Sequence, residues 1–95
     1  MSLLDLQTIV EKNEDILSSP VDEETVLLSI EDSSYYGIDP VGTSIWNLLD
    51  SPRSVKEIVT ALLAVYDVDE EKCKSDVLSF LKILIKKNII QLHSD

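Results

Sequence analysis

The hydrophobic positions of this chain follow two periods, and the change between them divides the sequence near residue 40. Residues 25–31 alternate, which places Val26, Leu28 and Ile30 on one apolar face and predicts a half-buried strand. Beyond residue 40 the apolar positions recur three and four residues apart, as on one face of a helix. The chain therefore predicts strands first and helices afterwards.

A second strand is predicted at residues 34–39, after the turn-like Glu-Asp-Ser-Ser segment. It places Tyr36 and Ile38 on one face. A two-residue loop would bring Leu28 opposite Gly37, whereas a three-residue loop would bring Leu28 opposite Ile38. Because the second register joins the apolar faces, we prefer it.

The N-terminal part is polar and acidic. Residues 1–14 are expected either to fray or to form a first short strand near residues 8–10. Residues 15–19 predict a further strand, and Pro20 suits the edge of a sheet because it cannot donate a ladder hydrogen bond.

Three helices follow, and their ends carry clear signals. Asp39 or Pro40 opens the first helix, because proline is tolerated in the first turn. Ser54, with Glu57 three residues later, forms the capping-box pattern of the second. Asn88 is expected to cap the end of the third. These signals and the apolar spacing place the helices at about residues 40–49, 55–66 and 69–87, with a last short strand at 89–92.

The length of 95 residues is sufficient for one domain with a single core. We therefore predict one α+β domain over residues 1–95. Its expected plan is winged helix-turn-helix-like, with a small antiparallel three-stranded sheet followed by a three-helix bundle.

The third helix is more apolar than a single buried face requires. A first stripe contains Cys73, Val77, Phe80 and Leu84. A second stripe, shifted by one residue, contains Lys74, Leu78, Leu81 and Ile85. Either the small sheet covers the second stripe, or that stripe lines a binding groove.

Charge is distributed unevenly. Residues 1–50 hold 11 acidic residues and one basic residue, whereas residues 51–95 hold seven of each, so the whole net charge of −10 lies in the N-terminal half. Such a field repels phosphate and makes nucleic acid a poor partner, whereas a cationic or neutral partner is accommodated more easily. The acids could equally serve only to keep a small domain soluble.

Residues suited to catalysis are scarce. The chain has one histidine, His93, near its end, and one cysteine, Cys73, on an apolar helix stripe. These do not make a catalytic triad or a zinc site of usual spacing. The only glycines, Gly37 and Gly42, do not form a phosphate-binding loop. We therefore expect a protein that is not an enzyme and needs no metal or cofactor.

A cytoplasmic location is expected, with no membrane contact. The lone cysteine excludes an internal disulfide and fits a reducing compartment. The N-terminus lacks the basic region of a signal peptide, and no apolar run reaches the roughly 18 residues of a membrane span.

Two functions fit the predicted plan. A winged-helix regulator would place its third helix in the major groove of DNA, but this helix carries acids beside its lysines and lacks Arg, Asn or Gln for reading bases. A peptide-binding protein would instead pair an extended peptide with the open edge of the strand at 34–39. Tyr35 and Tyr36 suit this role, because each offers a large contact area with a polar tip. The same edge could also pair two copies of the chain as a homodimer.

A family resemblance favours the peptide. The segment from residue 35 to about residue 92 resembles the PqqD-like family of peptide-recognition proteins, and among them the stand-alone members from lasso-peptide gene clusters. The resemblance is carried by Tyr35-Tyr36-Gly37, Pro40-Val41-Gly42-Thr43, Ile45-Trp46, Leu48-Leu49, Pro52-Arg53-Ser54-Val55 and Glu57-Ile58-Val59.

The resemblance implies a RiPP recognition element, which binds the leader of a ribosomally synthesised precursor peptide. It also implies two partner enzymes of the same pathway, a leader peptidase and a macrolactam synthetase. The leader would add as a strand beside the third strand and rest on the third helix, while Trp46 packs in the core. The positions implied to bind the peptide are Tyr35, Tyr36, Gly37, Ile38, Lys74, Leu78, Leu81 and Ile85.

Overall fold

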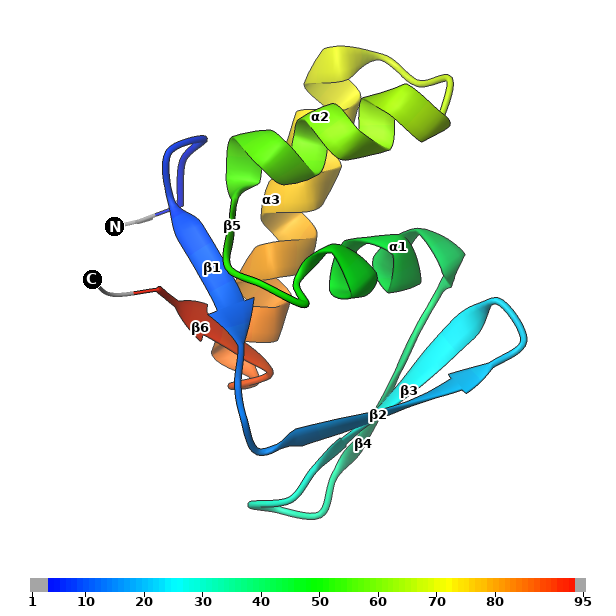
Figure 1. Ribbon diagram of the computed structural model, residues 1–95, viewed down its shortest axis with the longest axis vertical. Coiled ribbons are helices and arrows are strands. Elements are labelled where there is room, and N and C mark those ends of the chain that lie inside the picture. The colour runs from blue at the N-terminus through cyan, green and yellow to red at the C-terminus, as the bar shows by residue number, and fades with distance from the viewer. Residues whose placement is uncertain (1–3, 94–95) are drawn as a thin grey trace.

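Residues 4–93 are described by a computed structural model, and they form two small antiparallel sheets and three helices (Figure 1). The strands are β1 (Ile9–Lys12), β2 (Ile16–Val21), β3 (Glu24–Ser29), β4 (Tyr35–Ile38), β5 (Arg53–Ser54) and β6 (Ile90–Leu92). The helices are α1 (Pro40–Leu48), α2 (Val55–Val65) and α3 (Glu70–Lys86).

The first sheet has the order β2-β3-β4, and both of its strand pairs are antiparallel. This confirms the α+β class and the expected three-stranded sheet that precedes three helices. Strands β2 and β4 are therefore the two edges of this sheet. Pro20 lies in β2, an edge position where its missing N–H removes no bond from the middle of the sheet.

The register of β3 and β4 is not the expected one. Leu28 lies opposite Tyr35, and both registers considered above, including the preferred pairing with Ile38, are wrong. The reason is a four-residue loop at residues 30–33, in which Ser33 takes the left-handed conformation with φ of 59°. The longer loop shifts β4 along β3.

The buried face of β3 also differs from the apolar face seen in the sequence. Leu27 and Thr25 are buried, because they lie on the face of β3 that α1 covers. The hydroxyl of Thr25 is hydrogen-bonded to that of Thr43 in α1 at 2.9 Å, and this bond replaces the hydrogen bond to water that the buried hydroxyl loses. The predicted apolar face is instead the outer face, where Ile30 is exposed.

A second sheet, with the order β5-β1-β6, was not expected. Its central strand is β1, in which Val10 is fully buried. Of the two expectations for residues 1–14, the first short strand near residues 8–10 is confirmed as β1, and residues 1–3 lie outside the part of the chain described. The predicted last strand is confirmed as β6, which pairs with β1. Because of this extra sheet, winged helix-turn-helix is only a loose description.

The helix ends follow the predicted signals. The Asp39 side chain accepts a 2.7 Å hydrogen bond from the backbone N–H of Gly42, which caps α1. Ser54 and Glu57 form a complete capping box at α2. Asn88 follows α3 in the left-handed conformation with φ of 60°, and two hydrogen bonds complete a Schellman motif there.

The three helices and both sheets share one core. Trp46 is buried in it, as expected, and so are Val55 and Leu62 of the predicted α2 stripe. From α3 the core receives Cys73, Val77, Leu81 and Leu84. None of the helices within residues 4–93 is long and apolar enough to cross a membrane.

The contact between α1 and α3 is tight at one point. A Cβ atom added to Gly42 would lie 2.9 Å from Cζ of Phe80, which is closer than van der Waals contact allows. The missing side chain at Gly42 thus lets the Phe80 ring lie against the first turn of α1. This contact fixes the direction in which Phe80 points.

We predict that Gly42→Ala lowers or leaves unchanged the free energy of unfolding, because a gain in helix propensity of up to about 1 kcal/mol is opposed by overpacking against Phe80. In a Phe80→Ala background the same change should be stabilising. Urea unfolding of the four proteins in this double-mutant cycle measures the difference. Equal effects of Gly42→Ala in both backgrounds would show that the ring does not contact Gly42.

Candidate functional site

The open edge of the first sheet is β4, which pairs with β3 on one side only among the described residues. The backbone N–H of Ser29 donates to the carbonyl of Ser34 at 2.9 Å. Because hydrogen-bonded and non-hydrogen-bonded pairs alternate in an antiparallel ladder, this bond fixes the phase of β4. Tyr36 and Ile38 bond to β3, whereas the N–H and C=O groups of Tyr35 and Gly37 point toward the open edge.

The outer face of the sheet is open along this strand. A Cβ atom built at Gly37 would meet nothing within 4 Å, and the side chain of Tyr35 is 73% exposed. A short edge strand with outward-pointing backbone groups can accept an additional strand. An extended peptide is the simplest ligand that satisfies both donors and acceptors.

One flank of α3 forms the wall beside β4. Lys87 lies over the ring of Tyr36, with its Nζ 5.3 Å from the ring centroid, and Phe80 contacts Gly42 in the first turn of α1. Ile83 lies between them at helical spacing and is partly exposed. This flank therefore offers an apolar surface with a cationic end to a peptide bound along β4.

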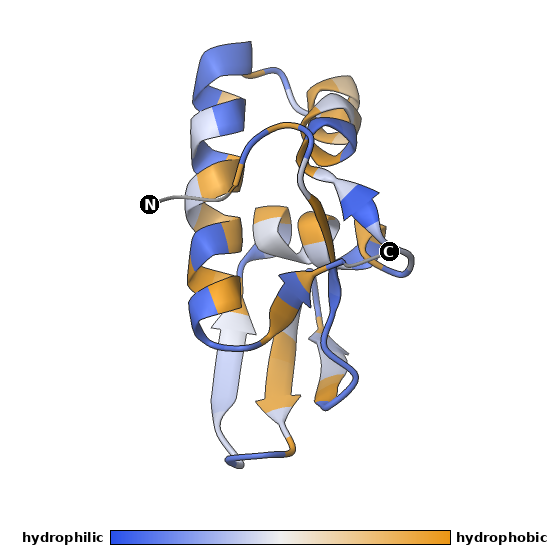
Figure 2. Ribbon diagram, turned by 90° about the vertical axis from the view of Figure 1, so that its left-hand side faces the viewer, coloured by the Kyte–Doolittle hydropathy of each residue, from blue (hydrophilic) through white to orange (hydrophobic). Residues whose placement is uncertain are grey.

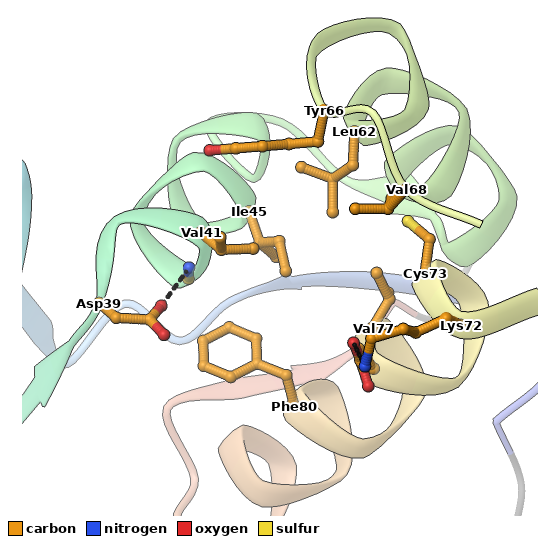
Figure 3. Close-up of a pocket in the computed structure, with 12 residues that line it drawn as sticks. Asp39, Val41, Ile45, Leu62, Tyr66, Val68, Lys72, Cys73, Val77 and Phe80 are labelled. Carbon is orange, nitrogen blue, oxygen red and sulfur yellow. Dashed lines mark hydrogen bonds and ion pairs between the residues drawn. The ribbon is translucent and has the colours of Figure 1, made fainter. Parts of the chain in front are cut away.

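A cavity of about 350 Å³ opens at the end of β4, between α1, the end of α2 and the N-terminal half of α3 (Figure 3). Its polar side chains already have partners. Asp39 caps α1, Lys72 forms a 3.3 Å ion pair with Asp76, and the Tyr66 hydroxyl is hydrogen-bonded to Ser44 at 3.0 Å. Its apolar lining is formed by Val41, Ile45, Leu62, Val68, Cys73, Val77 and Phe80. Such a cavity fits an apolar side chain better than a charged one.

Catalytic chemistry has no clear basis in this cavity. Burial, and to a lesser extent the nearby charge of Asp76, raise the pKa of the Cys73 thiol, which is the reverse of what activates a nucleophile. Within residues 4–93, no three His, Cys, Asp or Glu side chains are grouped so that they could hold a metal ion.

The predicted strand residues Tyr35, Tyr36, Gly37 and Ile38 do lie together on β4. Their geometry gives them different possible roles. Tyr35 and Gly37 direct backbone groups outward, Tyr36 turns a half-buried ring toward α3, and the side chain of Ile38 is buried in the core.

The predicted helix residues Lys74, Leu78 and Ile85 lie on a different flank of α3 from Phe80 and Ile83. On a helix of about 3.6 residues per turn, Lys74, Leu78 and Ile85 lie nearly opposite the flank that faces β4. Leu81 is 0% exposed and belongs to the core, so it does not line a groove. The spacing correctly places the residues of the second stripe close together around α3. Spacing alone does not show which neighbouring element each flank of the helix contacts.

Phe80, Ile83 and Lys87 are not among the predicted site residues, and they lie on the flank of α3 that faces β4. They recur at i, i+3 and i+7, which is helical spacing, whereas the sequence pattern places Phe80 in the first stripe. The only sequence signal that pointed to this flank was Gly42, whose missing side chain admits Phe80.

Known structures with the same fold include peptide complexes. The structure of TbiB1 in complex with the TbiA(beta) leader peptide matches with 34% identity and a TM-score of 0.82, over 90% of this chain and 99% of that one. A lasso peptide synthetase B1 complexed with the leader peptide matches with 19% identity and a TM-score of 0.72, over 86% and 96% of the two chains.

A third structure is the PqqD truncation of Methylobacterium extorquens PqqCD, described as a functional and stand-alone RiPP recognition element. It matches with 20% identity and a TM-score of 0.77, over 93% of this chain and 94% of that one. At this identity the second and third structures show a shared fold.

Among curated proteins, none matches the chain. The family model for PqqD, the coenzyme PQQ synthesis protein D, matches residues 24–90, which include the β4 edge and the whole of α3. This chain therefore belongs to the PqqD family.

Proposed function

We propose that this protein binds the leader segment of a ribosomally synthesised precursor peptide, which adds as a strand along β4. The observation that carries the proposal is the open edge at Tyr35 and Gly37, facing a flank of α3. It is supported by the 34% identity to TbiB1, whose structure contains a leader peptide.

Recognition would be divided between backbone and side chains. The outward N–H and C=O groups of Tyr35 and Gly37 would form ladder hydrogen bonds that any extended peptide can make. Alternate side chains of the peptide would then point toward Phe80 and Ile83 on α3, and this contact would select sequence. An apolar residue at one end could enter the cavity beside Asp39.

We further propose that the protein acts on a lasso-peptide precursor and presents it to a leader peptidase and a macrolactam synthetase, without catalysis of its own. The resemblance of the β4–α2 motifs to stand-alone lasso-peptide proteins supports this pathway. The matched structures support leader binding and do not support DNA binding as the alternative. In α3, moreover, Lys72 is already paired with Asp76.

The edge of β4 is tested by Gly37→Pro. Proline removes the N–H that points outward and leaves the N–H groups that bond to β3, so the fold should persist while leader binding weakens by at least tenfold. Gly37→Ala is the matched control, because its Cβ meets nothing, and it should bind the leader within about twofold of wild type. Calorimetric titration with the leader from the same gene cluster measures both. Equal affinities for the two variants, with both folded by circular dichroism, would mean that the leader does not pair with β4.

The flank of α3 is tested by a pair of Ile→Gln changes two residues apart. Ile83→Gln should weaken leader binding by about tenfold, since it places an amide where the peptide buries apolar surface. Ile85→Gln lies on the other flank and should change leader affinity by less than twofold, even if it lowers stability slightly. Titration at a temperature where both variants are fully folded gives the comparison. If Ile85→Gln weakens leader binding more than Ile83→Gln does, the leader binds instead on the flank that contains Lys74, Leu78 and Ile85.

A further inference from the structure

Lys87 lies at the end of the α3 flank that faces β4, and the backbone pairing proposed above does not use its charge. Its Nζ lies 5.3 Å from the centroid of the Tyr36 ring, which is a cation–π contact. Lys87 is exposed, whereas Tyr36 is half-buried. The ring therefore holds the ammonium group beside β4 without neutralising it.

Among residues 4–93, no carboxylate forms an ion pair with Lys87. Asp32 lines the same cavity of about 180 Å³ at the start of β4. Its carboxylate, however, accepts hydrogen bonds from the hydroxyl of Ser34 at 2.6 Å and from the backbone N–H of Ser34 at 3.0 Å. These bonds hold Asp32 in the turn between β3 and β4, and they lower the pKa of its carboxyl group. The ammonium of Lys87 is thus left for another anion.

The two ends of α3 differ in charge. Residues 69–76 contain four acids and two lysines, whereas residues 77–87 contain three lysines and no acid. Figure 2 shows hydrophilic and hydrophobic segments alternating along α3 down to its C-terminal end above the sheet. Because Lys87 lies over Tyr36 and Asp76 lines the cavity beside Asp39, the positive end is near the start of β4 and the negative end near its finish. An anionic group is favoured at the first of these positions only.

The ladder determines which peptide side chain would reach Lys87. Residues directly opposite each other in neighbouring strands place their side chains on the same face of a sheet. Tyr36 and Ile38 both turn their side chains toward the helices, since one contacts Lys87 and the other is buried in the core. The peptide residue opposite Tyr36 would therefore point toward Lys87. The peptide residue opposite Ile38, two positions away in either strand direction, would point toward the end of the flank that contains Phe80.

A carboxylate is the side chain that suits the position opposite Tyr36. A lysine or arginine there would be repelled by Lys87, and an apolar side chain would remove water from the ammonium group without replacing it. An aspartate or glutamate would form a charge-assisted hydrogen bond with the ammonium. The bound peptide would also shield this pair from solvent, which strengthens it relative to a fully exposed pair.

We infer that Lys87 selects an acidic residue of the leader, which lies opposite Tyr36 and two positions from the residue opposite Ile38. Lys87 is then a specificity-determining residue of the peptide site, and Phe80 and Ile83 supply the apolar contact. This inference rests on the proposed function.

Variants of Lys87 are titrated calorimetrically with the leader from the same gene cluster. Lys87→Met removes the charge and should weaken leader binding by about fivefold. Lys87→Arg keeps the charge and should bind within about twofold of wild type. Lys86→Met is the matched control, because it removes the same charge from an exposed neighbour at the end of α3, and it should also stay within about twofold.

The leader is varied in parallel, with each of its acidic residues replaced in turn by the corresponding amide. Every leader variant is titrated with wild-type protein and with Lys87→Met. One replacement should weaken binding to wild-type protein by about fivefold and leave binding to Lys87→Met unchanged, because both changes remove the same ion pair. The other replacements should affect the two proteins equally.

If Lys87→Met binds the leader as Lys86→Met does, or if no acidic residue of the leader couples to Lys87, the inference is wrong. It is also wrong if Lys87→Met and Asp32→Asn weaken leader binding equally and both unfold at lower urea concentration, since Lys87 would then support the turn before β4. Failure of the wild-type protein to bind the leader at all would instead overturn the proposed function.

Discussion

A strand with one neighbour leaves half of its backbone hydrogen-bonding groups without a partner in the sheet, and β4 is such a strand among the described residues. The proposed binding of a peptide strand depends on that constraint. The bond from Ser29 to Ser34 sets the phase of the ladder, and the phase assigns the outward groups to Tyr35 and Gly37. An extended peptide supplies the complementary groups at regular spacing, whereas a DNA groove does not.

The edge can select a peptide only if it is held in one position. Asp39 caps α1 immediately after β4, and Gly42 lets Phe80 of α3 pack against the same turn. Lys87 covers the Tyr36 ring near the start of the strand. These contacts connect β4, α1 and α3, so a peptide would meet a wall that is already formed, which lowers the entropy cost of binding.

Local signals predicted much of the fold, because caps and periodicity depend on neighbours in sequence. The capping box at Ser54, the left-handed Asn88 and the strand at residues 34–39 were all predicted correctly. The register of β3 and β4 was not, since a four-residue loop was not distinguished from shorter ones. The flank of α3 that faces β4 was not identified for a related reason: the orientation of α3 is set by contacts with elements that are distant in sequence. The β4 residues of the site remain a prediction supported by their geometry.

Amide hydrogen exchange along β4 tests strand addition most directly, because it reports each backbone N–H separately. In the free protein the amides of Tyr36 and Ile38 should be protected by β3, whereas those of Tyr35 and Gly37 should exchange rapidly. Addition of the leader peptide should slow exchange at Tyr35 and Gly37 by at least tenfold and change Tyr36 and Ile38 much less. Leader binding without any slowing at Tyr35 and Gly37 would contradict the account.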